Sequence, residues 1–163
     1  MRTTDKTLFE QMQISDIEID YRKSLLGITS ADIELMRSCK SAIETEVDGI
    51  VNEFYSQQTA IDEIALLIGD ADSLARLHKA QRGYISSLFN GYYDNDYVNN
   101  RLRIGLVHKR IGVGPKLYLS AMKTLKDLIL EALERNLKDK VKLFNVYVVL
   151  DKLFYLDTTL VFD

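Results

Sequence analysis

The chain has 163 residues, of which 47% are hydrophobic and 28% charged, and this predicts one domain with one sizeable core. Its net charge of −3 comes without a basic block, so nucleic-acid binding is not supported. The start lacks the apolar core of a signal peptide, and the apolar run VYVVL near the end is too short to span a bilayer. Cys39 is the single cysteine, which excludes an intrachain disulfide and favours a cytoplasmic protein with no membrane partner.

Helical periodicity dominates the chain, and capping residues mark where helices begin and end. The segment TSADIE predicts a helix start with Thr29 or Ser30 as N-cap. Apolar residues then recur at spacings of 4, 3 and 4, which predicts a helix over about 41–57. A short helix is expected over 60–68, ended by Gly69.

Two further helices follow in the middle of the chain. Asp70 or Asp72 is the predicted cap of the first, which stops near Gly91. The segment DNDYVNN begins the second, which carries His108 and ends at Gly112. Glycine at that position can adopt the left-handed conformation that closes a helix.

The last two predicted helices cover residues 115–135 and 139–161. Pro115 suits the first turn of a helix, so RIGVGP forms a sharp corner just after His108. The final helix is apolar over much of its surface, which indicates burial on more than one side. We therefore expect a homodimer that forms a four-helix bundle through the last two helices. The alternative is a fully internal last helix in a monomer.

The usual enzyme motifs are not found in the sequence, which has no metal-ligand spacing, phosphate-binding glycine loop or nucleophile elbow. What remains is His108 on a helix, with Ile104 and Ile111 on the same face. Such a histidine is more often a core residue. An apolar helical cavity with one inward imidazole is, however, also how a protein holds haem iron with an open sixth position.

The segment HKRIGVGPKLYL at 108–119 resembles the proximal segment of the globin domains of bacterial globin-coupled sensors. Those domains carry His-x-Arg-Ile-Gly-x-x-Pro-Lys-x-Tyr, with the histidine as iron ligand. The residues that match are His108, Arg110, Ile111, Gly112, Pro115, Lys116 and Tyr118. The resemblance extends upstream through NEFY at 52–55 and covers most of 29–160.

This resemblance implies an all-α, globin-like fold with a short extra N-terminal helical segment. The implied domains are a helical extension at 1–28 and a globin sensor domain at 29–163. The implied cofactor is haem b, iron protoporphyrin IX, with His108 as the proximal ligand. The implied ligand is molecular oxygen, with carbon monoxide and nitric oxide as further ligands.

Two side chains are predicted to donate hydrogen bonds on the distal side. Tyr55 stands where the family has its distal tyrosine. Gln81 is found by periodicity, because it is the polar interruption in a stripe of leucine and isoleucine, and a buried amide needs partners. The family often has Ser or Thr at the position of Ala80, which cannot donate. The alternatives are a Tyr55 hydroxyl in solvent and a Gln81 at the wet edge of the stripe.

The remaining pocket predictions concern the walls of the cavity. Leu77 is expected to form the apolar distal wall, and Ile104 and Ile111 lie beside His108. His78 could occupy the sixth position of the iron, although a surface or edge role is favoured. Tyr118 faces the proximal side in the family, where it relays ligand state into the last two helices or simply packs in the core.

The favoured function is a haem-based oxygen-sensing domain that regulates a C-terminal output and catalyses nothing itself. The expected output is a diguanylate cyclase, which makes cyclic di-GMP. The alternatives are a chemotaxis-type transducer, a stand-alone haem redox globin acting on oxygen or nitric oxide, and a helical interaction module without cofactor. No output domain is found in the 163 residues, so we expect a fragment or a stand-alone relative.

Overall fold

The computed structural model describes residues 7–12 and 14–163, and within them the chain forms helices and no strands. The helices are α1 (Leu8–Gln11), α2 (Asp16–Leu25), α3 (Ser30–Ser38), α4 (Lys40–Thr59), α5 (Asp62–Ile68), α6 (Ala71–Phe89), α7 (Asn95–Ile111), α8 (Pro115–Asn136) and α9 (Lys140–Val161). The predicted all-α fold is confirmed.

The capping residues define where helices α3 and α6 begin. The Thr29 hydroxyl accepts a hydrogen bond from the Asp32 backbone N–H at 3.2 Å, and the Thr29 N–H donates to the Asp32 carboxylate at 3.0 Å. Thr29, rather than Ser30, is therefore the cap of α3. The Asp70 carboxylate accepts from the Ser73 N–H at 2.7 Å and caps α6 in the same way.

The corner between α7 and α8 has the predicted geometry. Gly112 has a φ of 83°, which is the left-handed conformation that favours glycine. The Val113 N–H donates to the His108 carbonyl at 2.9 Å and so satisfies one of the last carbonyls of α7. Pro115 then occupies the first turn of α8. The turn thus holds the end of α7, and with it His108, at a fixed angle to α8.

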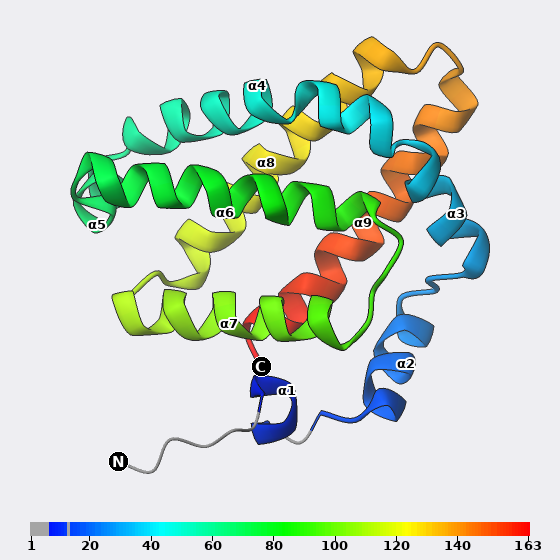
Figure 1. Ribbon diagram of the computed structural model, residues 1–163, viewed down its shortest axis with the longest axis horizontal. Coiled ribbons are helices and arrows are strands. Elements are labelled where there is room, and N and C mark those ends of the chain that lie inside the picture. The colour runs from blue at the N-terminus through cyan, green and yellow to red at the C-terminus, as the bar shows by residue number, and fades with distance from the viewer. Residues whose placement is uncertain (1–6, 13) are drawn as a thin grey trace.

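The larger helices pack in two groups, one formed by α4 and α6 and the other by α7 and α9. In Figure 1, α4, α6 and α7 run across the view one below another, and α8 and α9 cross them diagonally. Helix α6 packs mainly on α4, whereas α7 packs mainly on α9 and α1. Helix α8 packs on both α4 and α9 and joins the groups. The space between α6 and α7 is therefore where the two groups face each other.

Helices α7 and α9 approach each other most closely at Gly105. A Cβ atom at this position would overlap the carbonyl oxygen of Val161, which is backbone and cannot rotate away. The small residue is therefore required by the packing of the two helices rather than by the conformation of α7 itself.

The last helix has one buried and one exposed face. Side chains such as Val146, Leu150 and Leu153 are buried in the core. The opposite face remains exposed and consists of Val141, Phe144, Tyr147, Val148 and Tyr155. No partner chain is described, so the dimer stays a prediction. No helix in the described part of the chain is long and apolar enough to cross a membrane.

The N-terminal segment packs against the rest of the chain. Ile14 and Ile19 are buried in the common core. The Arg22 guanidinium donates to the Thr159 carbonyl at 3.0 Å and to the Asp163 carboxylate at 2.6 Å, which ties α2 to the end of α9. The domain division between residues 28 and 29 stays a prediction.

Candidate functional site

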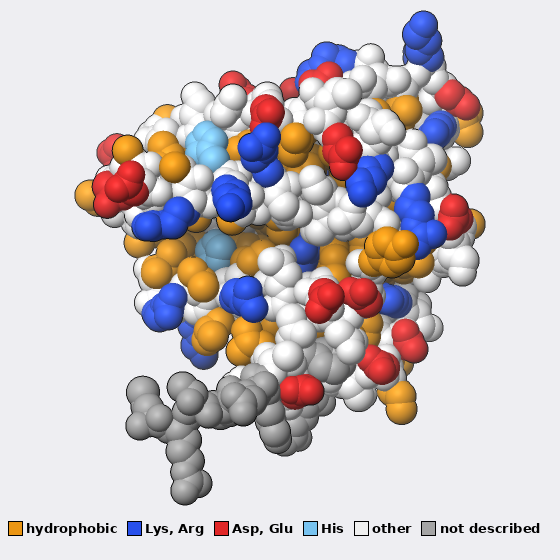
Figure 2. All heavy atoms as spheres, in the orientation of Figure 1, with side chains coloured by type: hydrophobic (Ala, Val, Ile, Leu, Met, Phe, Trp, Pro, Cys, Tyr) orange, Lys and Arg blue, Asp and Glu red, His pale blue; other side chains and the backbone are white. Residues whose placement is uncertain are grey.

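A hollow lies between α6 and α7, where the two packing groups face each other. Figure 2 shows that its floor is largely hydrophobic and that one histidine side chain is visible in it. Helix α6 carries Leu77, His78 and Gln81, and α7 carries Ile104 and His108. The two helices that border this crevice thus carry most of the side chains that the sequence singled out.

The ring of His108 is held by its own helix. Its Nδ1 lies 2.7 Å from the carbonyl oxygen of Ile104, one turn earlier. A carbonyl oxygen can only accept, so Nδ1 carries the hydrogen and donates it. Nε2 is then the ring nitrogen that this bond leaves available to a metal. The bond therefore fixes the orientation of the His108 ring and leaves Nε2 for a ligand.

Aromatic rings connect His108 to the end of α9. The Tyr118 ring packs edge-on against the His108 ring with centroids 5.5 Å apart, and against the Phe162 ring at 5.3 Å. Tyr118 itself is buried, and burial raises the pKa of its hydroxyl above the ordinary value. Tyr118 thus lies beside His108, whereas its place in a haem pocket and its relay role stay predictions.

Tyr55 of α4 packs against α6 beside Leu77 and His78. The Tyr55 hydroxyl donates to the Leu77 carbonyl at 3.3 Å, so the alternative of a hydroxyl in solvent is not what the structure contains. Burial raises the pKa of Tyr55 to about 12, and the group is a neutral donor at physiological pH. The His78 ring stacks on Tyr55 with centroids 4.8 Å apart and an angle of 23°. The His78 ring thus packs flat on the Tyr55 phenol, and its place on the distal side stays a prediction.

Gln81 carries a donor that has no acceptor. Its Nε2 atom is buried, and no described residue accepts a hydrogen bond from it. A buried amide N–H without a partner is unfavourable by about 1–3 kcal/mol. The wet-edge alternative does not hold for this atom. Gln81 therefore has a buried donor that a partner from outside the protein could satisfy.

The predicted apolar walls are only partly covered by the protein itself. Leu77 is 36% exposed and Ile111 is 44% exposed, and Ile104 is half-buried. These side chains lie on the two helices that border the crevice, and their role as pocket walls stays a prediction.

The sequence analysis missed a polar cluster formed by side chains of α6, α7 and α9. Arg101 of α7 and Asp157 of α9 are 0% and 1% exposed, and the Arg101 Nε lies 3.1 Å from the Asp157 Oδ1. Asp157 interrupts the apolar stripe of α9 between Leu153 and Leu160. The same argument that found Gln81 would have found Asp157.

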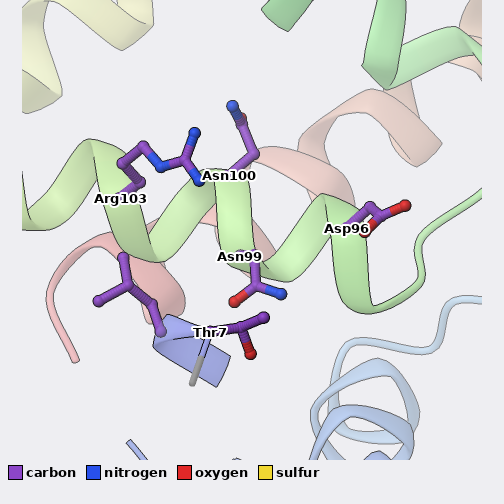
Figure 3. Close-up of a pocket in the computed structure, with 6 residues that line it drawn as sticks. Thr7, Asp96, Asn99, Asn100 and Arg103 are labelled. Carbon is purple, nitrogen blue, oxygen red and sulfur yellow. The ribbon is translucent and has the colours of Figure 1, made fainter. Parts of the chain in front are cut away.

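Two pockets lie along α7. One of about 670 Å³ adjoins His108 and is lined by Gly105, Tyr118 and Phe162 among others. A smaller one of about 240 Å³ lies between α1 and the first half of α7, and Figure 3 shows Asn99 and Thr7 on its walls. The larger pocket includes His108 but no residue of α6, and the smaller includes neither.

Comparisons with known proteins agree on one family. Residues 15–163 match the protein-family model described as Protoglobin. The heme-based aerotactic transducer HemAT of Halobacterium salinarum is 28% identical over 127 residues, which cover 77% of this chain and 26% of the transducer. The chain thus spans about a quarter of the length of this relative. The globin domain of the Geobacter sulfurreducens globin-coupled sensor superposes with a TM-score of 0.81 at 25% identity, covering 87% of this chain and 93% of that one.

Proposed function

Because the chain belongs to the protoglobin family, we propose that it binds haem between α6 and α7 and acts as an oxygen-sensing globin domain. The predicted globin fold and the resemblance to globin-coupled sensors are confirmed by the family match and the structural likeness. The names of the relatives, a heme-based aerotactic transducer and a globin-coupled sensor, support the sensing role.

The observation that carries the proposal is the orientation of His108. Its Nδ1–H is committed to the Ile104 carbonyl, which leaves Nε2 to hold the haem iron. The uncovered apolar surface of Leu77 and Ile111 suits the faces of a porphyrin. Haem, when bound, supplies an iron that takes up diatomic gases reversibly.

We assign the cofactor as haem b, which is held without covalent bonds. Covalent attachment of haem c uses the motif Cys-x-x-Cys-His, and the sequence has a single cysteine. That residue, Cys39, is fully buried at the junction of α3 and α4.

Two donors face a gas ligand in this arrangement. The Gln81 amide is free to donate, whereas the Tyr55 hydroxyl must first release the Leu77 carbonyl. Bound oxygen develops more negative charge than carbon monoxide, so a donor stabilises oxygen selectively. A hydrogen bond to a charged acceptor contributes about 1.5–3 kcal/mol. We therefore assign Gln81 as the first distal donor and Tyr55 as the second.

The sensing role needs a partner and an output. We assign the exposed apolar face of α9, Val141 to Tyr155, to a homodimer through the last two helices. Residues 29–163 form the sensor domain in this proposal, and the domain acts in the cytoplasm. The output is a diguanylate cyclase or a chemotaxis-type transducer, and the name of the Halobacterium relative favours the transducer.

Absorption spectroscopy of the purified, haem-supplemented chain tests the proposal. We expect a Soret band, a five-coordinate ferrous spectrum without gas and a stable change with oxygen. His108→Ala should abolish this spectrum, and His78→Ala should retain it. A six-coordinate ferrous spectrum that His78→Ala converts to five-coordinate would instead assign His78 as the sixth ligand. Catalytic turnover of oxygen or nitric oxide with a reductant would favour a redox globin over a sensor.

A further inference from the structure

Both oxygens of the Asp157 carboxylate are engaged inside the protein. The Tyr84 hydroxyl of α6 donates to Oδ2 at 2.6 Å, and the Tyr97 hydroxyl of α7 donates to Oδ1 at 2.5 Å. The Arg101 guanidinium of α7 pairs with Oδ1 at 3.1 Å. A single carboxylate on α9 therefore collects one contact from α6 and two from α7.

The charges in this cluster are compensated locally. The Arg101 guanidinium carbon lies 4.2 Å from the centroid of the Tyr84 ring and 3.7 Å from that of Tyr97, so the cation packs against two aromatic faces. Burial by itself lowers the pKa of Arg101, but the Asp157 carboxylate outweighs it and keeps the guanidinium charged. Burial also raises the pKa of both tyrosines well above the ordinary value, so both remain donors.

The cluster connects the two packing groups of the fold. Helix α6 otherwise packs mainly on α4, and α7 on α9. The Tyr84–Asp157 hydrogen bond crosses from α6 directly to α9. Arg101 adds a second connection, because its Nη1 donates to the Ser87 hydroxyl of α6 at 3.0 Å.

The residues of the proposed gas site lie on the same helices at helical spacing. Gln81 precedes Tyr84 by three residues on α6, and His108 follows Arg101 by seven residues on α7. Residues three, four and seven apart share one face of a helix. A shift of α6 that brings Gln81 to a ligand therefore also moves the Tyr84 hydroxyl relative to α9.

We propose that Asp157 is the positioning residue through which a ligand-dependent shift of α6 against α7 reaches α9. This inference rests on the proposed gas site. It adds a polar route into α9, distinct from the ring contacts of His108, Tyr118 and Phe162. The physical requirement is a contact that differs between two states of the protein, and the Tyr84–Asp157 bond is that contact.

Hydrogen exchange measured by mass spectrometry tests the route in the haem-loaded ferrous protein, with and without carbon monoxide. For the wild type we expect backbone exchange over residues 150–161 to differ between the two conditions by about twofold or more. Tyr84→Phe removes the one hydroxyl that joins α6 to Asp157 and should abolish the difference. The readout is the difference between conditions, because a merely structural role would change exchange equally in both.

Tyr93→Phe is the matched control. The Tyr93 hydroxyl is also buried, but it donates to the Leu88 carbonyl at 2.6 Å and not to Asp157. We expect this variant to keep the ligand-dependent difference. Asp157→Asn should behave like Tyr84→Phe, and Asp151→Asn, on the same helix but paired with Lys126 of α8, should behave like the wild type.

The outcomes separate this inference from the proposed function. If the wild type takes up no haem or no carbon monoxide, the proposed function fails. If it binds both, the inference is overturned by a wild type without a ligand-dependent difference at α9, or by a Tyr84→Phe variant that keeps it. A difference lost in Tyr93→Phe as well as in Tyr84→Phe overturns it too, because the effect would then be one of core packing.

Discussion

The two ends of the α6–α7 crevice are built from similar residues but differ in how their polar groups are satisfied. At the end near His108, the Gln81 amide has no acceptor and the Tyr55 hydroxyl makes a long bond of 3.3 Å. At the other end, both oxygens of Asp157 accept bonds of 2.5–2.6 Å. Two Arg101 nitrogens there also lack a hydrogen bond within the described residues, but the guanidinium is paired with Asp157 and packed on two aromatic rings. A buried donor with no partner favours the entry of a ligand, whereas a paired charge holds its helices together. The end at Gln81, the open end, can therefore take a partner from outside, whereas at the Asp157 end, the fixed end, the protein without ligand supplies the partners itself.

The largest expected effect comes from removing the Asp157 carboxylate at the fixed end of the crevice. Asp157→Ala leaves the Arg101 charge buried and unpaired, and removal of one member of a buried pair lowers stability by about 3–5 kcal/mol. We expect a loss of this size in the free energy of unfolding, measured by urea titration.

Asp151→Ala is the matched control for this measurement. Asp151 lies on the same helix and pairs with Lys126 at 2.8 Å, but its side chain is 37% exposed. An exposed pair contributes about 0–1 kcal/mol. Equal losses in the two variants would contradict the view that the buried cluster holds this end together.

The next effect concerns Gln81 at the open end of the crevice and the rate at which oxygen dissociates. Gln81→Leu removes the unpaired donor while keeping a side chain of similar size. Loss of a hydrogen bond worth about 1.5–3 kcal/mol corresponds to about 10- to 100-fold faster oxygen dissociation, measured by stopped flow. Gln57→Leu makes the same replacement at an exposed glutamine of α4 that bonds to Glu53, and it should leave the rate unchanged. An unaltered rate in Gln81→Leu would exclude Gln81 as the distal donor.

A smaller effect is expected where α7 crosses α9. Gly105→Ala forces a Cβ against the Val161 carbonyl, and overpacking of this kind lowers stability by about 1–3 kcal/mol. Gly83→Ala is the control, because its Cβ would meet nothing within 4 Å and alanine is the better helix former by about 1 kcal/mol. The two alanine variants should therefore move the urea midpoint in opposite directions. A higher urea midpoint in both variants would mean that α7 and α9 can move apart without a loss of stability.

Local chemistry predicted more of this fold than tertiary contacts did. The cap at Thr29, the cap at Asp70 and the Gly112–Pro115 corner depend on neighbouring residues, so the sequence contains all that is needed to place them. Gln81 was found because it interrupts an apolar stripe, which is also a local signal.

The Asp157 cluster is different in kind. Its hydrogen-bond partners Tyr84 and Tyr97 lie 73 and 60 residues away in the chain. They meet only because α6, α7 and α9 cross at one end of the crevice, and no periodicity fixes that crossing. The polar interruption at 157 could have been noticed, but its partners could not have been named.

The last expected effect uses pH to test the open end. Burial raises the pKa of Tyr55 to about 12, whereas the ordinary value for tyrosine is about 10. Between pH 10 and 12 the unfolded chain loses the Tyr55 proton while the folded chain keeps it. The free energy of unfolding therefore falls with rising pH by about 1.4 kcal/mol per unit on account of this residue.

The other buried tyrosines act in the same direction, because burial also raises the pKa of Tyr93 and Tyr118. The test therefore compares how steeply the free energy of unfolding falls with pH in the wild type and in Tyr55→Phe, measured by urea titration from pH 9 to 12. We expect the variant to have the shallower fall, with no difference below pH 9. Tyr21→Phe removes an exposed phenol and should leave the slope as in the wild type. Parallel slopes for the wild type and Tyr55→Phe would mean that the distal wall admits water freely, and a donor there would then be too well solvated to discriminate between gases.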